Sequence, residues 1–252
     1  MGSITGKLFF RFFDSMATDV LITKSEISDL MIERPVSFSI KGKHFSVFPA
    51  TLGKMQLTAR LLEAAGLSEQ IEVTSLYGRI LKAAQEHRSE CLRLVAYATL
   101  KGDECLDENK VLKRLKELRK MDDVSIASLV VVYLSLDKSE QAIKHFAIDV
   151  ETSKMNKVLK VKQDNKNTLC FGGRSVWGTL IDAACERYGW SLQYVLWDIS
   201  YSNLRLMLAD QVRSVYLSDE ERKKVNVSND RTIIRAEDSQ SLEEFISTHS
   251  WR

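Results

Sequence analysis

The side chains that could perform acid–base, metal or phosphate chemistry are spread thinly along this chain of 252 residues. Its histidines do not pair with one another or with a cysteine at the spacing of metal ligands: His44, His87, His145 and His249. No GxSxG, HExxH or glycine-rich nucleotide motif is present. We therefore predict no catalytic, metal or cofactor site. An unrecognised enzyme stays an alternative, because catalytic groups can assemble in space without a local motif.

One stretch has part of a phosphate-binding loop, since Gly173 and Gly178 have the spacing of the two glycines in that motif. The lysine that should follow the second glycine is missing. Leu180 stands where Ser or Thr would reach a magnesium ion, so the phosphate-binding interpretation fails. The acidic run Asp219–Glu221 is typical of a helix start, where carboxylates favour the helix dipole.

Composition indicates an ordinary globular protein, with 44% hydrophobic residues, 28% charged residues and a formal net charge of +2. This small charge gives no global field that attracts nucleic acid. A basic helix is expected over residues 107–120, but Glu108 and Glu117 dilute its charge and no aromatic residue lies among its basic side chains. We interpret it as a solvated face, with nucleic-acid binding as the alternative.

The N-terminus does not predict a membrane segment. Its apolar run Leu8–Phe13 is interrupted by Arg11, is too short to cross a bilayer and lacks the continuous core of a signal peptide. The four cysteines form no CxxC pair, and a chain of this length needs no disulfide framework, so reduced thiols are expected. We predict a cytoplasmic protein without membrane contact.

The periodicity of the apolar residues predicts an α+β fold that is mainly α. Apolar residues alternate with polar ones over Val36–Val47 around a break at Gly42, which predicts a small β-hairpin. After Thr51, an expected N-cap, the apolar residues take up helical spacing, and Gly66 is expected just after the first helix ends. Six short helices are expected as far as Val150.

Five parts of the chain are expected: an arm at 1–33, a hairpin plus helical domain at 34–150, a charged linker at 151–167, an aromatic-rich helical region at 168–224 and a tail at 225–252. The linker is assigned from its five lysines and few apolar residues, with a short exposed strand as the alternative. The arm has a sticky apolar face that is expected to pack on the body or to dock on a partner: Leu8, Phe9, Phe12, Phe13 and Met16.

The aromatic-rich region holds three of the four tryptophans and four of the seven tyrosines. Three successive helices are expected there, capped by Ser175, Ser191 and Ser202, with Gly189 ending the first. A stripe with spacings of four, three and four is expected on one side of a helical path: Trp190, Tyr194, Trp197 and Tyr201.

Two interpretations of this stripe stay open. Aromatic residues at helical spacing usually pack in a core, and the same residue types anchor protein–protein interfaces. Both hold if the covering surface belongs to another subunit, so a homo-oligomer is one possibility. The candidate partner-binding residues are Trp190, Tyr194, Trp197, Tyr201, Leu204, Met207 and Leu208.

Two stretches carry a resemblance to a known family. The run FGGRSVWGTLIDAACERYGWSLQYVLWDISYSNLRLMLAD (Phe171–Asp210) resembles the C-terminal part of phage and prophage tail assembly chaperones. In those proteins, a helix ending in YGW precedes a polar cap, an aromatic helix and a Leu-rich helix. The stretch Arg34–Leu62, with its hairpin and the sequence TLGKM, resembles their opening. The two stretches lie in the expected order.

The resemblance implies a non-catalytic protein, made in the cytoplasm of a bacterial host, that acts in virion assembly. Such a chaperone binds the tape-measure protein, helps to recruit tail-tube subunits and is absent from the finished tail. The chain departs from smaller members of the family in its N-terminal arm, in Lys154–Lys166 and in the tail after Lys224. A structural tail or baseplate component is the alternative function.

Overall fold

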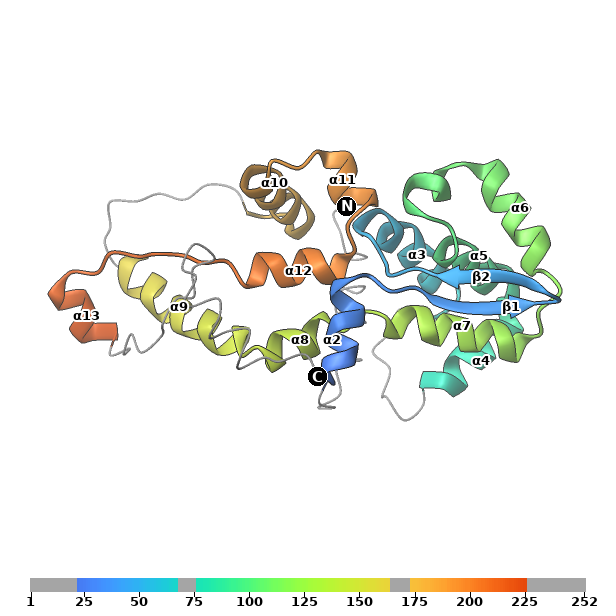
Figure 1. Cartoon of the computed structure of the whole chain (residues 1–252), viewed down its shortest axis with the longest axis horizontal. Coiled ribbons are helices and arrows are strands. Elements are labelled where there is room, and N and C mark those ends of the chain that lie inside the picture. The colour runs from blue at the N-terminus through green and yellow to red at the C-terminus, as the bar shows by residue number, and fades with distance from the viewer. Residues whose placement is uncertain (1–21, 68–75, 164–172, 226–252) are drawn as a thin grey trace. The chain divides into compact units, whose positions relative to one another are not determined.

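The computed structural model describes residues 22–67, 76–163 and 173–225, and within these ranges the chain is mainly helical with a two-stranded antiparallel sheet (Figure 1). The predicted α+β, mainly α fold is therefore confirmed. The chain divides into two compact units. The first contains residues 1–152 and 170–213, and the second contains residues 153–169 and 214–252.

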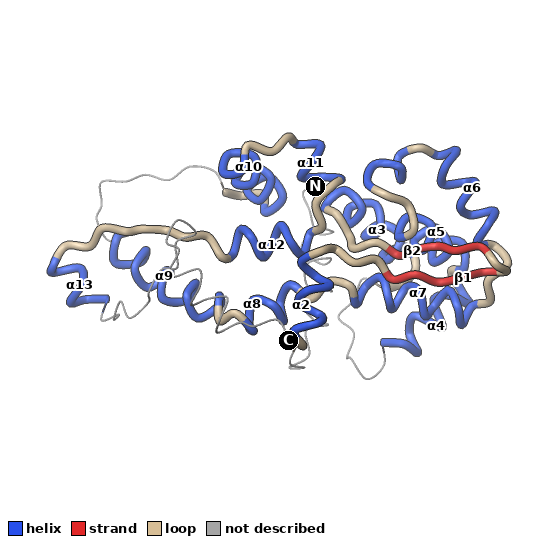
Figure 2. The backbone as a smooth tube through the Cα atoms, viewed as in Figure 1, coloured by secondary structure: helices blue, strands red, loops and turns tan. Residues whose placement is uncertain are grey.

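The hairpin of the first unit forms where the alternation predicted it, with β1 at Val36–Ile40 and β2 at Lys43–Val47 (Figure 2). Phe38 and Phe45 are partners in the register, and their rings stack with centroids 5.5 Å apart. Two residues, Lys41 and Gly42, connect the strands with φ of 48° and 79°. Positive φ at both positions is what a two-residue type I′ turn requires, so the turn matches the twist of the strands.

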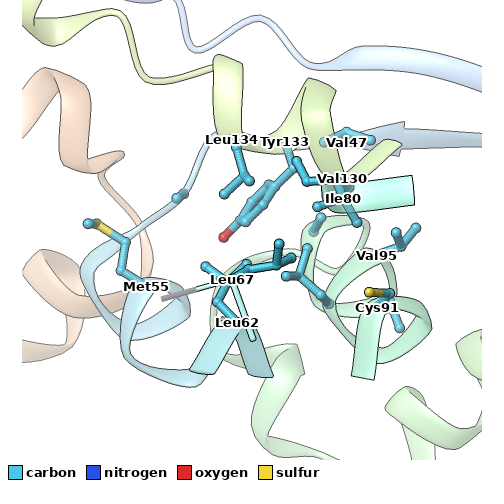
Figure 3. Close-up of a cluster of buried hydrophobic side chains, with 14 of the residues drawn as sticks. Val47, Met55, Leu62, Leu67, Ile80, Cys91, Val95, Val130, Tyr133 and Leu134 are labelled. Atoms are coloured by element: carbon cyan, nitrogen blue, oxygen red, sulfur yellow. The ribbon is translucent and has the colours of Figure 1, made fainter. Parts of the chain in front are cut away.

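The main core of the first unit is built by helices that follow the hairpin: α3 (Leu52–Ala64), α4 (Leu76–Glu86), α5 (Arg88–Ala98) and α7 (Asp123–Ser135), joined by the 3-10 helix η2 (Gly102–Leu106) and α6 (Glu108–Leu118). Tyr133 of α7 is fully buried, and Figure 3 shows its ring pointing towards Leu62 and Leu67. Side chains of β2 close the same core, since Phe45 and Val47 are buried in it.

Capping groups start and end these helices. Thr51 caps α3, as predicted, by accepting a hydrogen bond from the backbone N–H of Lys54, and Gly66 follows the end of that helix with φ of 68°. Asp107 and Asp122 cap α6 and α7 in the same way. Short-range hydrogen bonds thus define these helix boundaries.

A second apolar cluster joins α2 (Lys24–Met31), α8 (Ser139–His145) and α12 (Tyr201–Ala209), which lie far apart in the sequence. Ile22, Ile143 and Leu206 are buried together in it. Two ion pairs hold its edges: Lys138 with Glu26, and Arg205 with Glu140 at 2.5 Å. The side chain of Lys138, with help from Thr23, lowers the pKa of the Glu26 carboxyl to about 2. Glu26 therefore stays charged at neutral pH.

The structure also places the predicted parts of the chain. The aromatic-rich region, predicted as residues 168–224, belongs as far as Arg213 to the same compact unit as the hairpin and its helices. The predicted charged linker at 151–167 is helical as far as Gln163, within α9 (Ile148–Gln163), so the alternative of a short strand is wrong there. The absence of Gly and Pro from this stretch permits the helix. Residues 1–21 of the arm, 164–167 of the linker and 226–252 of the tail lie outside the described residues.

The second unit contains the end of α9 and the helix α13 (Asp219–Val225), whose first turn is the acidic run Asp219–Glu221. Glu221 accepts from the backbone N–H of Ser218 at 2.8 Å and pairs with Lys162 at 3.0 Å. The hydrogen bond from Ser218, followed by that from Lys162, lowers the pKa of Glu221 to about 2. These carboxylates begin a helix, as the sequence predicts.

A lysine is buried in the first unit. The side chain of Lys54, in the first turn of α3, is buried and donates to the carbonyl oxygen of Leu100. Burial lowers the pKa of its ammonium to about 8, and the nearby Cys105 and Glu104 partly offset this effect. Burial also raises the pKa of the Cys105 thiol to about 11.

We expect the stability contributed by Lys54 to depend on pH. Between pH 8 and 10.5 the folded chain holds fewer protons at this amine than the unfolded chain, whose amine has the ordinary pKa. The free energy of unfolding therefore rises with pH through this interval, by roughly 1.4 kcal/mol per pH unit from this group. Urea unfolding of the wild type and of Lys54→Met at several pH values measures the difference. If the free energies of unfolding of the two proteins change in parallel from pH 7 to 10, the lowered pKa of Lys54 is contradicted.

Candidate functional site

The aromatic-rich region begins with α10 (Val176–Tyr188), whose ends are specified locally. Ser175 accepts from the backbone N–H of Gly178 at 3.1 Å, and Gly189 ends the helix in the left-handed conformation with φ of 65°. The predicted roles of Ser175 as the N-cap and of Gly189 as the end of the helix are both confirmed. Ser175, inside the glycine-spaced stretch that partly matches a phosphate-binding loop, acts here as the N-cap.

Two shorter helices follow, α11 (Leu192–Trp197) and α12. Ser191 caps α11, as predicted, by accepting from the backbone N–H of Tyr194. The prediction for α12 was wrong by two residues, because Ser200 caps this helix. Ser202 lies within it, and its hydroxyl donates to the carboxylate of Asp137 at 2.7 Å. Ser200 and Ser202 stand two residues apart and are both good N-cap residues, and the tertiary contacts of Ser200 select it.

Those contacts interrupt the aromatic stripe. Ser200 and Thr51 form an isolated antiparallel bridge, and the backbone N–H of Tyr201 donates to the carbonyl oxygen of Ala50 at 2.7 Å. The extended backbone that these bonds require ends α11 at Trp197. The four aromatic residues therefore do not share one helix, although their spacing predicted one side of a helical path. The stripe is divided between two helices, and its members have different surroundings.

Glu33 forms a second link between the N-terminal part of the unit and the junction where α11 meets α12. One oxygen of its carboxylate accepts from the backbone N–H of Ser200 at 2.9 Å and from the side-chain amide of Asn203 at 3.0 Å. The same amide donates to the carbonyl oxygen of Met31. Glu33 has φ of 53°, an uncommon value for a residue with a side chain. The sequence analysis missed this residue, and no motif marks it.

Trp197 packs against the backbone of α3. A Cβ atom placed on Gly53 would lie 2.5 Å from two ring carbons of Trp197, closer than non-bonded carbons approach. Glycine at this position lets the indole lie flat on the helix. Glycine is unfavourable inside a helix, so Gly53 in the TLGKM sequence is a local signal that another group lies close to the helix backbone. Gly53 was not among the predicted site residues.

Three other candidate partner-binding residues pack in the core. Tyr201 and Leu204 are buried in the main cluster, and Leu208 is partly buried against it. On the other side of α12, Leu206 is buried in the second cluster. Helix α12 is therefore covered on two sides by side chains of this chain.

One group of side chains in this region combines partly buried rings with exposed residues, and we call it the aromatic patch: Tyr188, Trp190, Leu192, Tyr194 and Met207. Tyr188 and Trp190 are partly buried against the main cluster and stack with ring centroids 4.5 Å apart, and Trp190 meets Tyr194 at 5.0 Å. Leu192, Tyr194 and Met207 are 55%, 40% and 37% exposed. Accessible aromatic and apolar side chains of this kind suit binding of an apolar side chain.

Hydrogen bonds hold the aromatic patch in a defined geometry. The hydroxyl of Tyr188 donates to the carbonyl oxygen of Met207 at 3.0 Å, which joins the end of α10 to α12. On the neighbouring helix, Gln193 donates to Asp103 of η2 at 3.1 Å. Helix α10 itself is lightly packed, since Ala184 is its one fully buried residue. The patch residues thus come from α10, α11, α12 and the link between the first two, and Figure 1 labels these three helices.

Groups that could do chemistry are not gathered at this patch. Within the described ranges, no three His, Cys, Asp or Glu side chains come together as metal ligands would. His44 contacts Ser39 at 2.8 Å, and His145 lies edge-on to Phe146, so these two occupy separate elements. His249 lies outside the described residues. None of the helices described is long and apolar enough to cross a bilayer.

Comparisons of the chain with family models, with curated proteins and with solved structures found no match.

We expect Gly53→Ala to lower the free energy of unfolding by about 1–3 kcal/mol or more, because the new methyl group displaces the indole of Trp197. Gly78→Ala is the matched control, since nothing lies within 4 Å of a Cβ at that helical glycine. It is expected to be neutral or to stabilise by up to about 1 kcal/mol. Thermal and urea unfolding measure both. Equal effects of the two variants would exclude close packing at Gly53.

Substitutions at buried and at exposed candidate partner-binding residues are expected to lower the free energy of unfolding by different amounts. Leu204→Ala removes a fully buried side chain and is expected to cost about 2–5 kcal/mol. Tyr194→Ala removes a ring that is 40% exposed and is expected to cost about 1 kcal/mol or less. Urea unfolding of the two variants tests this division. A loss at Tyr194 as large as that at Leu204 would place the aromatic patch in the core.

Proposed function

We propose that this chain is a non-catalytic binding protein whose aromatic patch holds an apolar helix of a partner during phage or prophage tail assembly. The single observation that carries the binding role is the contact of the exposed Tyr194 ring with Trp190, which in turn stacks on Tyr188. Rigid aromatic side chains contribute large contact areas at a low cost in conformational entropy, and they are enriched among residues that dominate binding energy.

The geometry narrows the set of residues that make the contact. Tyr194 and Met207 are exposed and Trp190 is partly buried, whereas Tyr201 and Leu204 are enclosed by this chain's own side chains. Trp197 is half-buried against Gly53. We therefore assign the partner-binding role to the aromatic patch, with Trp197, Tyr201 and Leu204 in supporting positions.

The kind of partner follows from the residue types of the patch and from the family resemblance. Exposed aromatic, Leu and Met side chains suit the apolar face of an amphipathic helix. The resemblance of Phe171–Asp210 to tail assembly chaperones supports the long helical tape-measure protein as that partner. By the same resemblance, tail-tube subunits are recruited to the complex in the bacterial cytoplasm.

An affinity pull-down of the tagged full-length chain from its bacterial host tests the proposal. We expect mass spectrometry to identify a very long, helix-rich tail protein, and we expect Tyr194→Ala to lower its recovery at least tenfold. Tyr77→Ala is the matched control, because Tyr77 is a tyrosine on α4 with a similar exposure of 44%. Equal recovery with both variants, or recovery of metabolic enzymes alone, would contradict the proposal.

A structural tail or baseplate component is the second candidate, because the same resemblance supports a role in the tail. The two candidates differ in the fate of the protein. A chaperone leaves before the particle is complete, whereas a structural component stays. Immunodetection of this chain in purified particles would favour the structural role, and its absence from particles together with a complex in lysate would favour the chaperone.

A further inference from the structure

The outer edge of β1, the strand that pairs with β2 in Figure 2, has backbone groups without partners. Ile40 and Lys43 are register partners on either side of the two-residue turn, so they form the hydrogen-bonded pair that closes it. Such pairs alternate with non-hydrogen-bonded ones along an antiparallel ladder. The N–H and C=O groups of Ser37 and Ser39 therefore point away from β2. Within the described ranges, no other group forms a hydrogen bond with these backbone groups.

The side chains of these two serines support that assignment. The hydroxyl of Ser37 lies 3.1 Å from that of Ser46, and the hydroxyl of Ser39 lies 2.8 Å from Nδ1 of His44. Short contacts between register partners are typical of non-hydrogen-bonded pairs, whose side chains are closer together. Both serines are exposed, so the outer edge of β1 is open to solvent beside them.

Strand β1 also lacks the features that usually protect a free edge. Proteins block such edges with charged side chains, with proline inside the strand or with a covering element. The five residues Val36–Ile40 carry no charge, and Pro35 precedes the strand. On β2, by contrast, Lys43 is charged and pairs with Glu117 of α6 at 3.3 Å. Strand β1 is therefore the less protected of the two strands.

The free edge is complementary to a second copy of itself. If two β1 strands run antiparallel with Phe38 of one copy opposite Phe38 of the other, Ser37 of each copy lies opposite Ser39 of the other. Every outward N–H and C=O group of both serines then has a partner. The same register places Val36 opposite Ile40 of the second copy, and no charged side chains oppose each other within the strands. Cross-strand pairs of aromatic and β-branched residues stabilise a sheet.

The apolar side of the strand is only partly covered by its own chain. Val36 is 39% exposed, and Phe38 and Ile40 are partly buried against the main cluster. A neighbouring strand that presents the same residue types on this side removes more of their apolar surface from water, which is favourable. Because an isolated two-stranded sheet is marginally stable, added strands also stabilise the hairpin.

We propose that the outer edge of β1 pairs with β1 of a second copy, so that two hairpins form one continuous antiparallel sheet across a two-fold axis. A second copy suits this edge better than an extended peptide does. The far side of the second β1 is already paired with its own β2, whereas a bound peptide would present a new free edge. The pairing uses neither the aromatic patch nor the proposed function.

Charge substitutions at the two serines test this register in the full-length chain. In Ser37→Lys/Ser39→Lys, each new lysine lies opposite a lysine of the second copy, so the dissociation constant of the dimer is expected to rise about tenfold or more. Ser37→Lys/Ser39→Glu is the matched control, because each lysine then lies opposite a glutamate. It is expected to dimerise at least as tightly as the wild type. Sedimentation equilibrium measures all three proteins.

Three results would overturn the proposal. The first is a wild type that stays monomeric at about 0.5 mM, since a dimer with a dissociation constant below this value would be populated. The second is equal dimerisation of the Ser37→Lys/Ser39→Lys variant and its matched control. The third is loss of the dimer in Tyr194→Ala, which would place the contact at the aromatic patch. We expect Tyr194→Ala to dimerise as the wild type does.

A mixing experiment tests the pairing of opposite charges between copies. The variants Ser37→Lys/Ser39→Lys and Ser37→Glu/Ser39→Glu are each expected to be monomeric alone and to associate when mixed. If both keep the circular dichroism of the wild type and the mixture does not associate, the register is wrong. Hydrogen exchange of the wild type decides the case if a variant does not fold. The amides of Ser37 and Ser39 are expected to exchange more slowly as protein concentration rises, and exchange that is independent of concentration overturns the proposal.

Discussion

The contact between Trp197 and Gly53 is the constraint on which the arrangement of the aromatic region depends. An indole ring lies against the backbone of α3, at a distance that no side chain larger than hydrogen permits. Directly after it, the chain runs extended through Ser200 and bridges Thr51. Because the helix must end to make this bridge, α11 and α12 point their side chains into different surroundings. The separation of core residues from exposed ones follows from this one junction.

The junction joins parts of the chain that are far apart in sequence. Glu33 links it to the end of α2, and Ala50 and Thr51 link it to the chain just before α3. Each bond is an ordinary hydrogen bond, worth roughly 0.5–1.5 kcal/mol in net stability. Together these bonds satisfy backbone groups that would otherwise be buried without hydrogen-bond partners. Leaving such groups unpaired costs more free energy than a bond contributes. The aromatic region up to Arg213 is thus part of the first compact unit and not a separate module.

A hydrogen bond and a ring contact keep the aromatic patch in a defined geometry. Tyr188 is tied to Met207 through its hydroxyl, and its ring stacks on that of Trp190. A surface prepared in this way loses little conformational entropy on binding, which would favour the proposed affinity for a partner of modest contact area.

The sequence by itself determined what depends on neighbours along the chain. Alternation over Val36–Val47 specified the hairpin, and Thr51, Ser175 and Gly189 specified helix ends, because these signals act through bonds within a few residues. Tertiary structure decided which aromatic residues are buried. Spacing placed Tyr194 and Tyr201 on one stripe, yet Tyr201 is core and Tyr194 is exposed, since a bridge to Thr51 divides the helix between them. Such a bridge joins residues about 150 positions apart, and no local pattern encodes a contact over that separation.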